Sequence, residues 1–331
     1  LEKPSRKNLI YAGLVFGLGQ LLKFSLILLV PFLFFILLSF YLVKKQQGAK
    51  INIFRCVGAL LLIFIIGYAL VYPVYYFHVK NYPIEKQVNE TVFNLQSFKL
   101  KPASQLVAKM AGNPWLRPYA EYLLGLFMVF SRAAGGNTTY FLGEVTAQSW
   151  KAYFPTVYLL KEPLPILILI FVSIVTALWR FKKNKIKDWI SNNFTEFTCL
   201  AFIIFYWAVS ILGNLNIGLR HVLPTFPFIY LLVASQIKKW LAVPGFFGKP
   251  LKILAVGVLM LWYATESVLA FPYYLAYFNE LAGGPANGYK YAVDSNLDWG
   301  QDLRRLTKFV DENNIDKVKL VSLLRIMWPI L

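Results

Sequence analysis

The sequence is poor in charged residues and in cysteine. Asp, Glu, Lys and Arg together make up only 15% of its 331 residues, against roughly 25% in soluble domains. Its two cysteines, Cys56 and Cys199, each fall near the start of an apolar segment. They form no framework of paired spacings, so we interpret both as packing residues and exclude a disulfide-stapled fold.

Acidic residues are the scarcer charge. The chain has 16 Asp and Glu against 34 Lys and Arg, a net charge of +18. In a soluble protein this excess would suggest nucleic acid as the partner. Here the basic residues lie mostly between apolar segments, and no glycine-flanked aromatic platform or basic helix accompanies them. Orientation in a membrane explains the charge more simply, and we expect no nucleic-acid partner.

Apolar residues are abundant: they make up 58% of the chain, whose mean hydropathy is +0.54. These values are typical of a polytopic membrane protein with polar parts outside the membrane. The pattern predicts an all-α bundle of about seven transmembrane helices. The apolar segments are residues 8–22, 24–43, 56–77, 163–179, 197–213, 222–237 and 253–271. The first is short for a span of about 20 residues, so we expect it to be tilted or partly buried in protein.

The basic residues also predict the topology. Residues 1–7, 44–55, 180–187 and 238–252 carry 3, 4, 5 and 4 Lys or Arg, whereas the short turns on the other side hold only Lys23 and Arg220. By the positive-inside rule the N-terminus is cytoplasmic and the C-terminus extracytoplasmic. The chain then divides into three spans (1–77), an outer loop (78–161), four spans (162–271) and an outer tail (272–331), in the cell membrane. Within the loop, the apolar segment 120–130 is too short to cross, so we expect a surface-lying or re-entrant helix.

The outer tail carries signs of a small α/β domain. Leu303, Leu306 and Val310 share one helical face, and a strand-like segment, 318–324, follows. The segment 294–298 opens like a calcium loop, but Trp299 stands where that loop needs glycine and Arg305 where it needs glutamate. We therefore interpret its acids as helix-capping residues.

Two groups of cations could meet a phosphate. Arg220 and His221 precede an apolar helix that contains two prolines. At the mouth of a cavity between helices such a pair would bind phosphate, whereas at an open membrane surface it would only be solvated. Lys161 stands just outside another span and is either a snorkelling anchor or a second cation for the same ligand. Nearby, Trp150 and Tyr153 have the composition of a membrane interface or a sugar-binding face.

Four stretches carry a resemblance to a known family. They are GLVFGLGQLLKF (13–24), FLGEVTAQSWKAYFPTVYLLKEPLP (141–165), NIGLRHVLPTFP (216–227), and YLAYFNELAGGP with DSNLDWGQDL (274–285 and 294–303). Their order and spacing resemble bacterial members of the dolichyl-phosphate-mannose–protein mannosyltransferase-like family. These are lipid-carrier-dependent glycosyltransferases of the GT-C fold, several of which act in protein glycosylation.

The resemblance implies a mechanism and a set of site residues. A sugar would arrive on a polyprenyl phosphate, an acidic residue would deprotonate the acceptor hydroxyl, and cations would hold the departing lipid phosphate. Arg220 is the foremost phosphate-binding candidate, followed by His221 and Lys161. The substrate-loop candidates are Glu144, Trp150, Tyr153, Asn279 and Glu280. We identify no metal ligands and no certain cofactor, and a divalent-metal requirement stays open.

One departure from the family concerns the catalytic base. The resemblance places it in the first outer loop, yet no aspartate occurs before Asp188, and Glu2 is expected on the cytoplasmic side. We therefore expect the base to lie upstream of Leu1 and the chain to be a piece of such a transferase. Two alternatives stay open: a transporter or flippase for an anionic lipid or solute, and a non-catalytic membrane scaffold. The sugar, and whether the acceptor is protein, lipid or glycan, are not specified.

Overall fold

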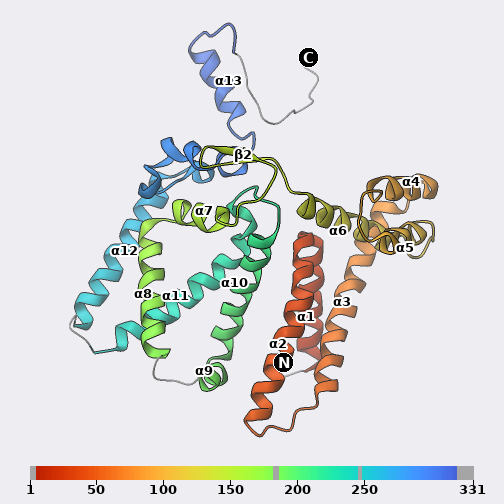
Figure 1. Cartoon of the computed structure of the whole chain (residues 1–331), viewed down its shortest axis with the longest axis horizontal. Helices are drawn as coiled ribbons and strands as arrows, with labels where there is room; N and C mark the ends of the chain where they lie inside the picture. The colour runs from red at the N-terminus through yellow and green to blue at the C-terminus, as the bar shows by residue number, and fades with distance from the viewer. Residues whose placement is uncertain (1–4, 182–185, 245–247, 319–331) are drawn as a thin grey trace. The chain divides into compact units, whose positions relative to one another are not determined.

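A computed structural model describes residues 5–181, 186–244 and 248–318 of the chain, and these residues are mostly helical (Figure 1). The chain forms two compact units. The first comprises Leu1–Gly135 and Phe181–Phe205, and the second Gly136–Arg180 and Tyr206–Leu331.

The first unit is built on a close helix pair. α1 (Arg6–Leu22) packs against α3 (Ile53–Val79), and a 3-10 turn (Phe24–Leu28) leads into α2 (Leu29–Gln46). Gly13 and Gly17, four residues apart on α1, face α3, and a Cβ on Gly17 would lie 2.6 Å from the carbonyl oxygen of Gly67. Glycines at this spacing allow two backbones in a membrane to touch. α9 (Ile186–Asn192) and the first part of α10 (Phe194–Leu212) complete the unit.

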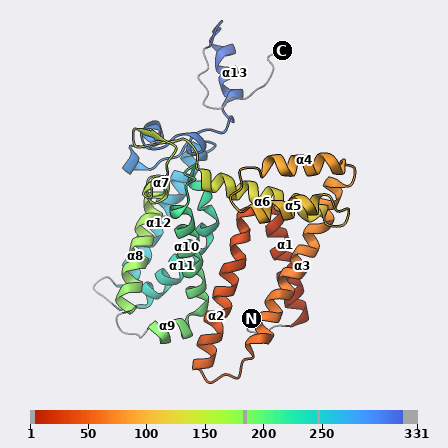
Figure 2. The same cartoon turned by 45° about the vertical axis from the view of Figure 1, so that its right-hand side comes forward.

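A cluster of shorter helices follows α3 in the same unit. It consists of α4 (Ile84–Asn94), α5 (Lys101–Ala111) and α6 (Arg117–Gly135). Both views show α6 running across the ends of α1 and α3 (Figures 1 and 2). The apolar segment 120–130 is thus part of a longer helix, with Pro83, Pro102 and Pro118 standing before or within the first turns of the three helices. The buried Tyr122 hydroxyl donates to Gln20 of α1 over 3.0 Å, which fastens the cluster to the helix pair.

The second unit begins with a short antiparallel hairpin of β1 (Thr139–Phe141) and β2 (Glu144–Thr146), with Thr139 opposite Thr146. The helices are α7 (Tyr153–Lys161), α8 (Leu164–Phe181), α11 (Phe226–Ala242), α12 (Lys249–Leu269) and α13 (Leu303–Glu312). The chain between α12 and α13 folds into 3-10 turns. The main core is formed by Phe141, Tyr153, Phe154, Val157, Leu219, Val222 and Ala292.

Five helices of the described residues are long and apolar enough to cross a membrane: the α2 helix with its preceding turn, α3, α8, α10 and α12. The chain is therefore a multi-pass membrane protein by the composition of its helices. The two other predicted spans, 8–22 and 222–237, form α1 and α11, but each of these helices has only 17 residues. At 1.5 Å per residue that is about 25 Å, short of a hydrocarbon core of about 30 Å. α11 begins late because Pro224 and Pro227 have no N–H to donate to a preceding turn.

The predicted tail is borne out in part. α13 covers Leu303, Leu306 and Val310 as the apolar spacing indicated. The predicted strand 318–324 lies outside the described residues except for Val318, so the α/β character of the tail stays a prediction.

Candidate functional site

Asn296 joins three separate stretches of the second unit. Its amide nitrogen donates to the hydroxyl of Tyr153 on α7 (2.8 Å), and its amide oxygen accepts the backbone N–H of Leu219 (3.1 Å). The side chain is only 1% exposed. The segments 141–165, 216–227 and 274–302, grouped by the resemblance alone, therefore pack against one another around a shared buried amide.

A second buried amide, Asn279, closes the end of α7. Its Nδ2 donates to the carbonyl oxygens of Leu159 and Glu162, both at 2.7 Å, and its backbone N–H donates to Leu160 (2.8 Å). The last carbonyls of a helix have no N–H partner within the helix. The three bonds from Asn279 therefore provide hydrogen-bond donors for carbonyl groups at the end of α7. Asn279, a predicted substrate-loop residue, thus lies in the interior and acts as a cap.

The ammonium group of Lys161 is hydrogen-bonded within the protein. Its Nζ donates to the backbone oxygens of Leu275 (2.8 Å), Tyr277 (3.0 Å) and Asn296 (2.8 Å), and lies 4.3 Å from the ring centroid of Phe278. An ammonium group has three N–H donors, and here each has a carbonyl. Burial lowers the pKa of Lys161 to about 7. The amine therefore holds the tail onto α7 rather than snorkelling to a membrane surface.

Glu162, which the sequence reasoning did not single out, is the most buried carboxyl group near this point. It is 3% exposed, and its Oε1 accepts the hydroxyl of Tyr230 over 2.8 Å. Burial raises the pKa of Glu162 to about 7. The sequence does carry a signal, since an acid between Lys161 and Pro163 stands immediately before a predicted span, where a carboxylate has few places to meet water.

Arg220 is the exposed residue among the three phosphate-binding candidates. It lies on a 3-10 turn (Leu219–His221), and its guanidinium carbon is 3.7 Å from the ring centroid of Trp299. The turn depends on Gly218, which has a φ of 144°; a Cβ there would lie 2.4 Å from the hydroxyl oxygen of Ser295. The same glycine that fits the turn against Ser295 thus places Arg220 above Trp299.

The other phosphate-binding candidate, His221, points the opposite way. Its ring is half-buried and packs edge-on against Phe154, with the centroids 6.5 Å apart. The structure therefore brings Arg220 and Lys161 to the same segment, 294–299, through Trp299 and the carbonyl of Asn296. Only Arg220 presents its charge at the surface.

The aromatic candidates belong mostly to the core. Tyr153 is fully buried and packs at a tilt of 58° against Phe141. Trp150 packs on the same ring, and its backbone N–H donates to Asn216 Oδ1 over 2.7 Å. Glu144 and Glu280 are exposed, the first on β2 and the second at the start of the 3-10 turn Glu280–Ala282. Because Tyr153 is fully buried, only the half-buried Trp150 could contribute to a sugar-binding face.

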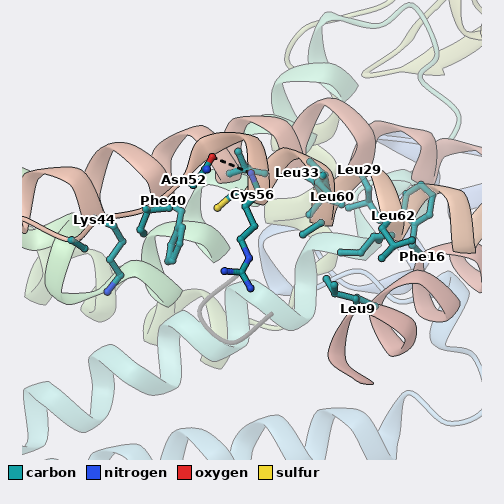
Figure 3. Close-up of a pocket in the computed structure, with 18 of the residues that line it drawn as sticks. Leu9, Phe16, Leu29, Leu33, Phe40, Lys44, Asn52, Cys56, Leu60 and Leu62 are labelled. Carbon is teal, nitrogen blue, oxygen red and sulfur yellow. Dashed lines mark hydrogen bonds between the residues drawn. The ribbon is translucent and has the colours of Figure 1, made fainter. Parts of the chain in front are cut away.

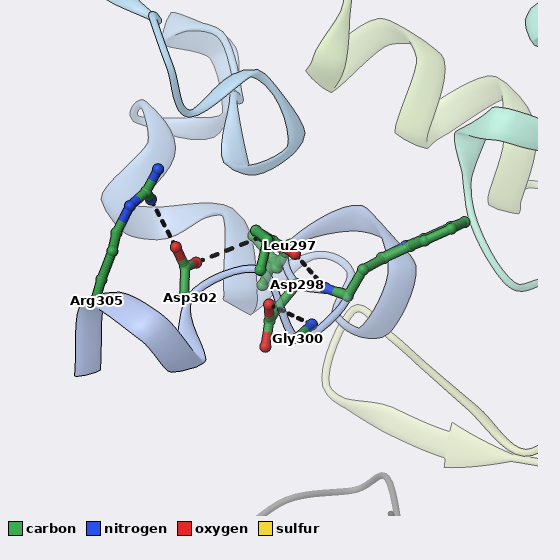
Figure 4. A network of polar contacts seen from close by, with 7 residues as sticks. Leu297, Asp298, Gly300, Asp302 and Arg305 are labelled. Carbon is green, nitrogen blue, oxygen red and sulfur yellow. Dashed lines mark hydrogen bonds and ion pairs between the residues drawn. The ribbon is translucent and has the colours of Figure 1, made fainter. Parts of the chain in front are cut away.

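The acids that follow Asn296 serve the local fold (Figure 4). Asp298 accepts the backbone N–H of Gly300 (2.9 Å), and Asp302 pairs with Arg305 (2.6 Å). Arg305 also stacks on Tyr273, 4.1 Å from its centroid. Asp302 stands at the N-cap of α13, yet its side chain accepts no backbone N–H there, so the predicted helix cap is wrong for this residue. No group of three metal-ligating side chains occurs among the residues that the structure describes.

Comparison with known families, with curated proteins and with solved structures finds no match to this chain.

Proposed function

We propose that this chain acts in a membrane glycosyltransferase that moves a sugar from a polyprenyl phosphate to an acceptor hydroxyl on the extracytoplasmic side of the cell membrane. The supporting observation is that Asn296 joins three of the four stretches that carry the family resemblance, all three in the second unit. Stretches more than 60 residues apart in the sequence share one buried amide. Arg220, which follows the Leu219 bound by this amide, is exposed.

Arg220 is the residue that we assign to the lipid phosphate. A guanidinium presents its donors along its edge, where they meet two phosphate oxygens at once, while its face is suited to stacking on an aromatic ring. Contact with Trp299 uses the face and restrains the side chain. A restrained donor set gains more from a departing phosphate because less conformational entropy is lost on binding.

Lys161 has a positioning role in this proposal. Its three bonds hold the backbone of residues 275–277 and 296 against α7 and so keep Trp299 beneath Arg220. His221 supports the turn from inside through Phe154. The acid that deprotonates the acceptor is not among the residues assigned here.

The test is sugar transfer by the full-length protein in proteoliposomes, with a polyprenyl-phosphate-linked sugar as donor. Arg220→Ala should lower kcat/KM about 100- to 1000-fold, the loss typical of removing one donor that stabilises a developing oxyanion, and Arg220→Lys should recover part of it. Arg305→Ala is the matched control, since Arg305 is also stacked on an aromatic ring, and should stay within about threefold of wild type. Transfer undiminished in Arg220→Ala would refute the assignment, and donor binding without any transfer by wild type would favour a scaffold.

A further inference from the structure

A large cavity lies among α1, α2 and α3 of the first unit (Figure 3). Its volume is about 1330 Å³, above the roughly 300–1,000 Å³ of sites for drug-sized ligands. In Figure 3, Lys44 and Phe40 lie at one end, and Leu9, Leu29 and Phe16 toward the other. The cavity is therefore apolar along most of its length and basic at one end.

One face of α2 lines the cavity. On α2 the lining residues Leu29, Leu33, Leu37, Phe40 and Lys44 recur every three or four positions, which is the spacing of a single helical face. This face is about 22 Å long at 1.5 Å per residue, more than half of a hydrocarbon core of about 30 Å. An extended hydrocarbon chain reaching from a headgroup toward the bilayer centre matches that length.

Small side chains keep the cavity open. Ala12 on α1 and Gly58 and Ala59 on α3 line it, and a Cβ added to Gly58 would meet nothing within 4 Å. Further along the same two helices, Gly17 and Gly67 are in backbone contact. The backbone contact is therefore at Gly67, whereas Gly58, closer along α3 to the basic Arg55, faces open space.

The charges at that end all have one sign. Lys44, Lys50 and Arg55 line the cavity, and no Asp or Glu is among the described residues that line it. In the sequence no acid occurs between Glu2 and Glu85, and Asp188 lies on α9, which packs against α2. Among the residues that the structure describes, none of the three cations forms an ion pair. Lys44 instead lies 5.8 Å from the ring centroid of Phe40, at the border between the basic and apolar parts.

We propose that this cavity binds an anionic phospholipid of the cytoplasmic leaflet, with its phosphate at Lys44, Lys50 and Arg55 and an acyl chain along the α2 face. Three cations with no carboxylate among the lining residues are complementary to an anionic headgroup. The apolar side chains along the rest of the cavity provide a matching surface for the acyl chain. Basic pockets between membrane helices on the cytoplasmic side are suited to such headgroups. The inference does not rest on the proposed transferase activity, whose donor phosphate is assigned to Arg220 in the other unit.

The test uses the whole chain, purified in detergent, stripped of lipid and returned to nanodiscs containing phosphatidylglycerol or phosphatidylcholine. Lipid retained after mild extraction is identified by native mass spectrometry. Wild type should retain phosphatidylglycerol in preference to phosphatidylcholine. Removing Lys44, Lys50 and Arg55 together by substitution with Gln should abolish that preference, since each surface cation contributes about fivefold.

Two further variants separate occupancy from folding. Gly58→Leu should fill the cavity and remove the retained lipid, whereas Gly257→Leu, at an equally open position on α12, should not. Substituting the exposed cations Arg180, Lys238 and Lys249 with Gln is the control for total charge. Equal retention of both lipids by wild type would overturn the proposal, as would lipid retention unchanged in Gly58→Leu or displacement of phosphatidylglycerol by equimolar polyprenyl phosphate.

Discussion

The side-chain amide of Asn296 donates to the hydroxyl of Tyr153 across 143 positions of sequence, with 2.8 Å between the two atoms. Both side chains are almost completely buried. Asn296 also accepts from Leu219, so one residue of the tail fixes both α7 and the turn that carries Arg220.

Replacing Asn296 with Ala should destabilise the second unit. The change leaves the Leu219 N–H and the Tyr153 hydroxyl buried without this partner, at a cost of about 2–4 kcal/mol. The apparent melting temperature in detergent should fall by about 5–15 °C. Asn313→Ala removes an exposed side-chain bond to Phe309 and should change it little. An Asn296→Ala protein as stable as wild type would show that this amide does not join the three stretches.

Gly218→Ala should be destabilising for two separable reasons. The φ of 144° is unfavourable for any residue with a Cβ, and that Cβ would lie 2.4 Å from Ser295 Oγ. Ser295→Gly in the same protein should restore only the steric part. A double-mutant cycle on the free energy of unfolding, derived from thermal melts, separates the steric cost from the backbone cost. The expected coupling energy between Gly218 and Ser295 is about 0.5–3 kcal/mol. Zero coupling would mean that Gly218 and Ser295 are not in contact.

Glu162 should make stability depend on pH. Its folded-state pKa of about 7 is above the ordinary value of 4.5, so between pH 4.5 and 7 the folded protein binds more protons than the unfolded one. The Glu162 contribution to stability is then fully present below pH 4.5 and is lost as pH rises to 7. Glu162→Gln keeps an acceptor for Tyr230 and should be more stable than wild type at pH 8, by up to about 3 kcal/mol.

Melting temperatures of wild type and Glu162→Gln from pH 4 to 8 test this expectation. The two curves should meet at low pH and separate as pH rises through 7. Glu144→Gln, at an exposed carboxyl group, is the control and should follow wild type throughout. A wild-type curve that rises between pH 5 and 7 relative to Glu162→Gln would contradict the assignment.

Gly17→Ala should loosen the α1–α3 pair. The new methyl would lie 2.6 Å from the Gly67 carbonyl oxygen, so the backbones must separate. Overpacking of this kind costs about 1–3 kcal/mol. Gly58→Ala on the same helix pair meets open space and should be neutral or slightly stabilising. Cleavage by a protease added at graded temperatures, followed at residues 1–135, distinguishes the two variants.

The sequence by itself determined the properties that depend on neighbouring residues. Runs of apolar side chains marked the five described helices that are long and apolar enough to cross a membrane, because a helix satisfies its own backbone and needs only a continuous apolar surface to enter a membrane. The spacing of Leu303, Leu306 and Val310 marked α13 for the same local reason. Helix starts were less clear from hydropathy, so α11 begins four residues later than its apolar segment, after Pro224.

Only the tertiary structure decided what the candidate polar residues do. Lys161 has the sequence of a membrane-surface anchor, yet its partners are 114 to 135 positions away. Asn279 and Tyr153 have the composition of a substrate loop, yet both lie in the interior. Whether a polar side chain meets a ligand or another part of the chain depends on which distant carbonyl or amide folding brings to it. That pairing is determined by the packing of whole segments, so it cannot be predicted from residue type and spacing.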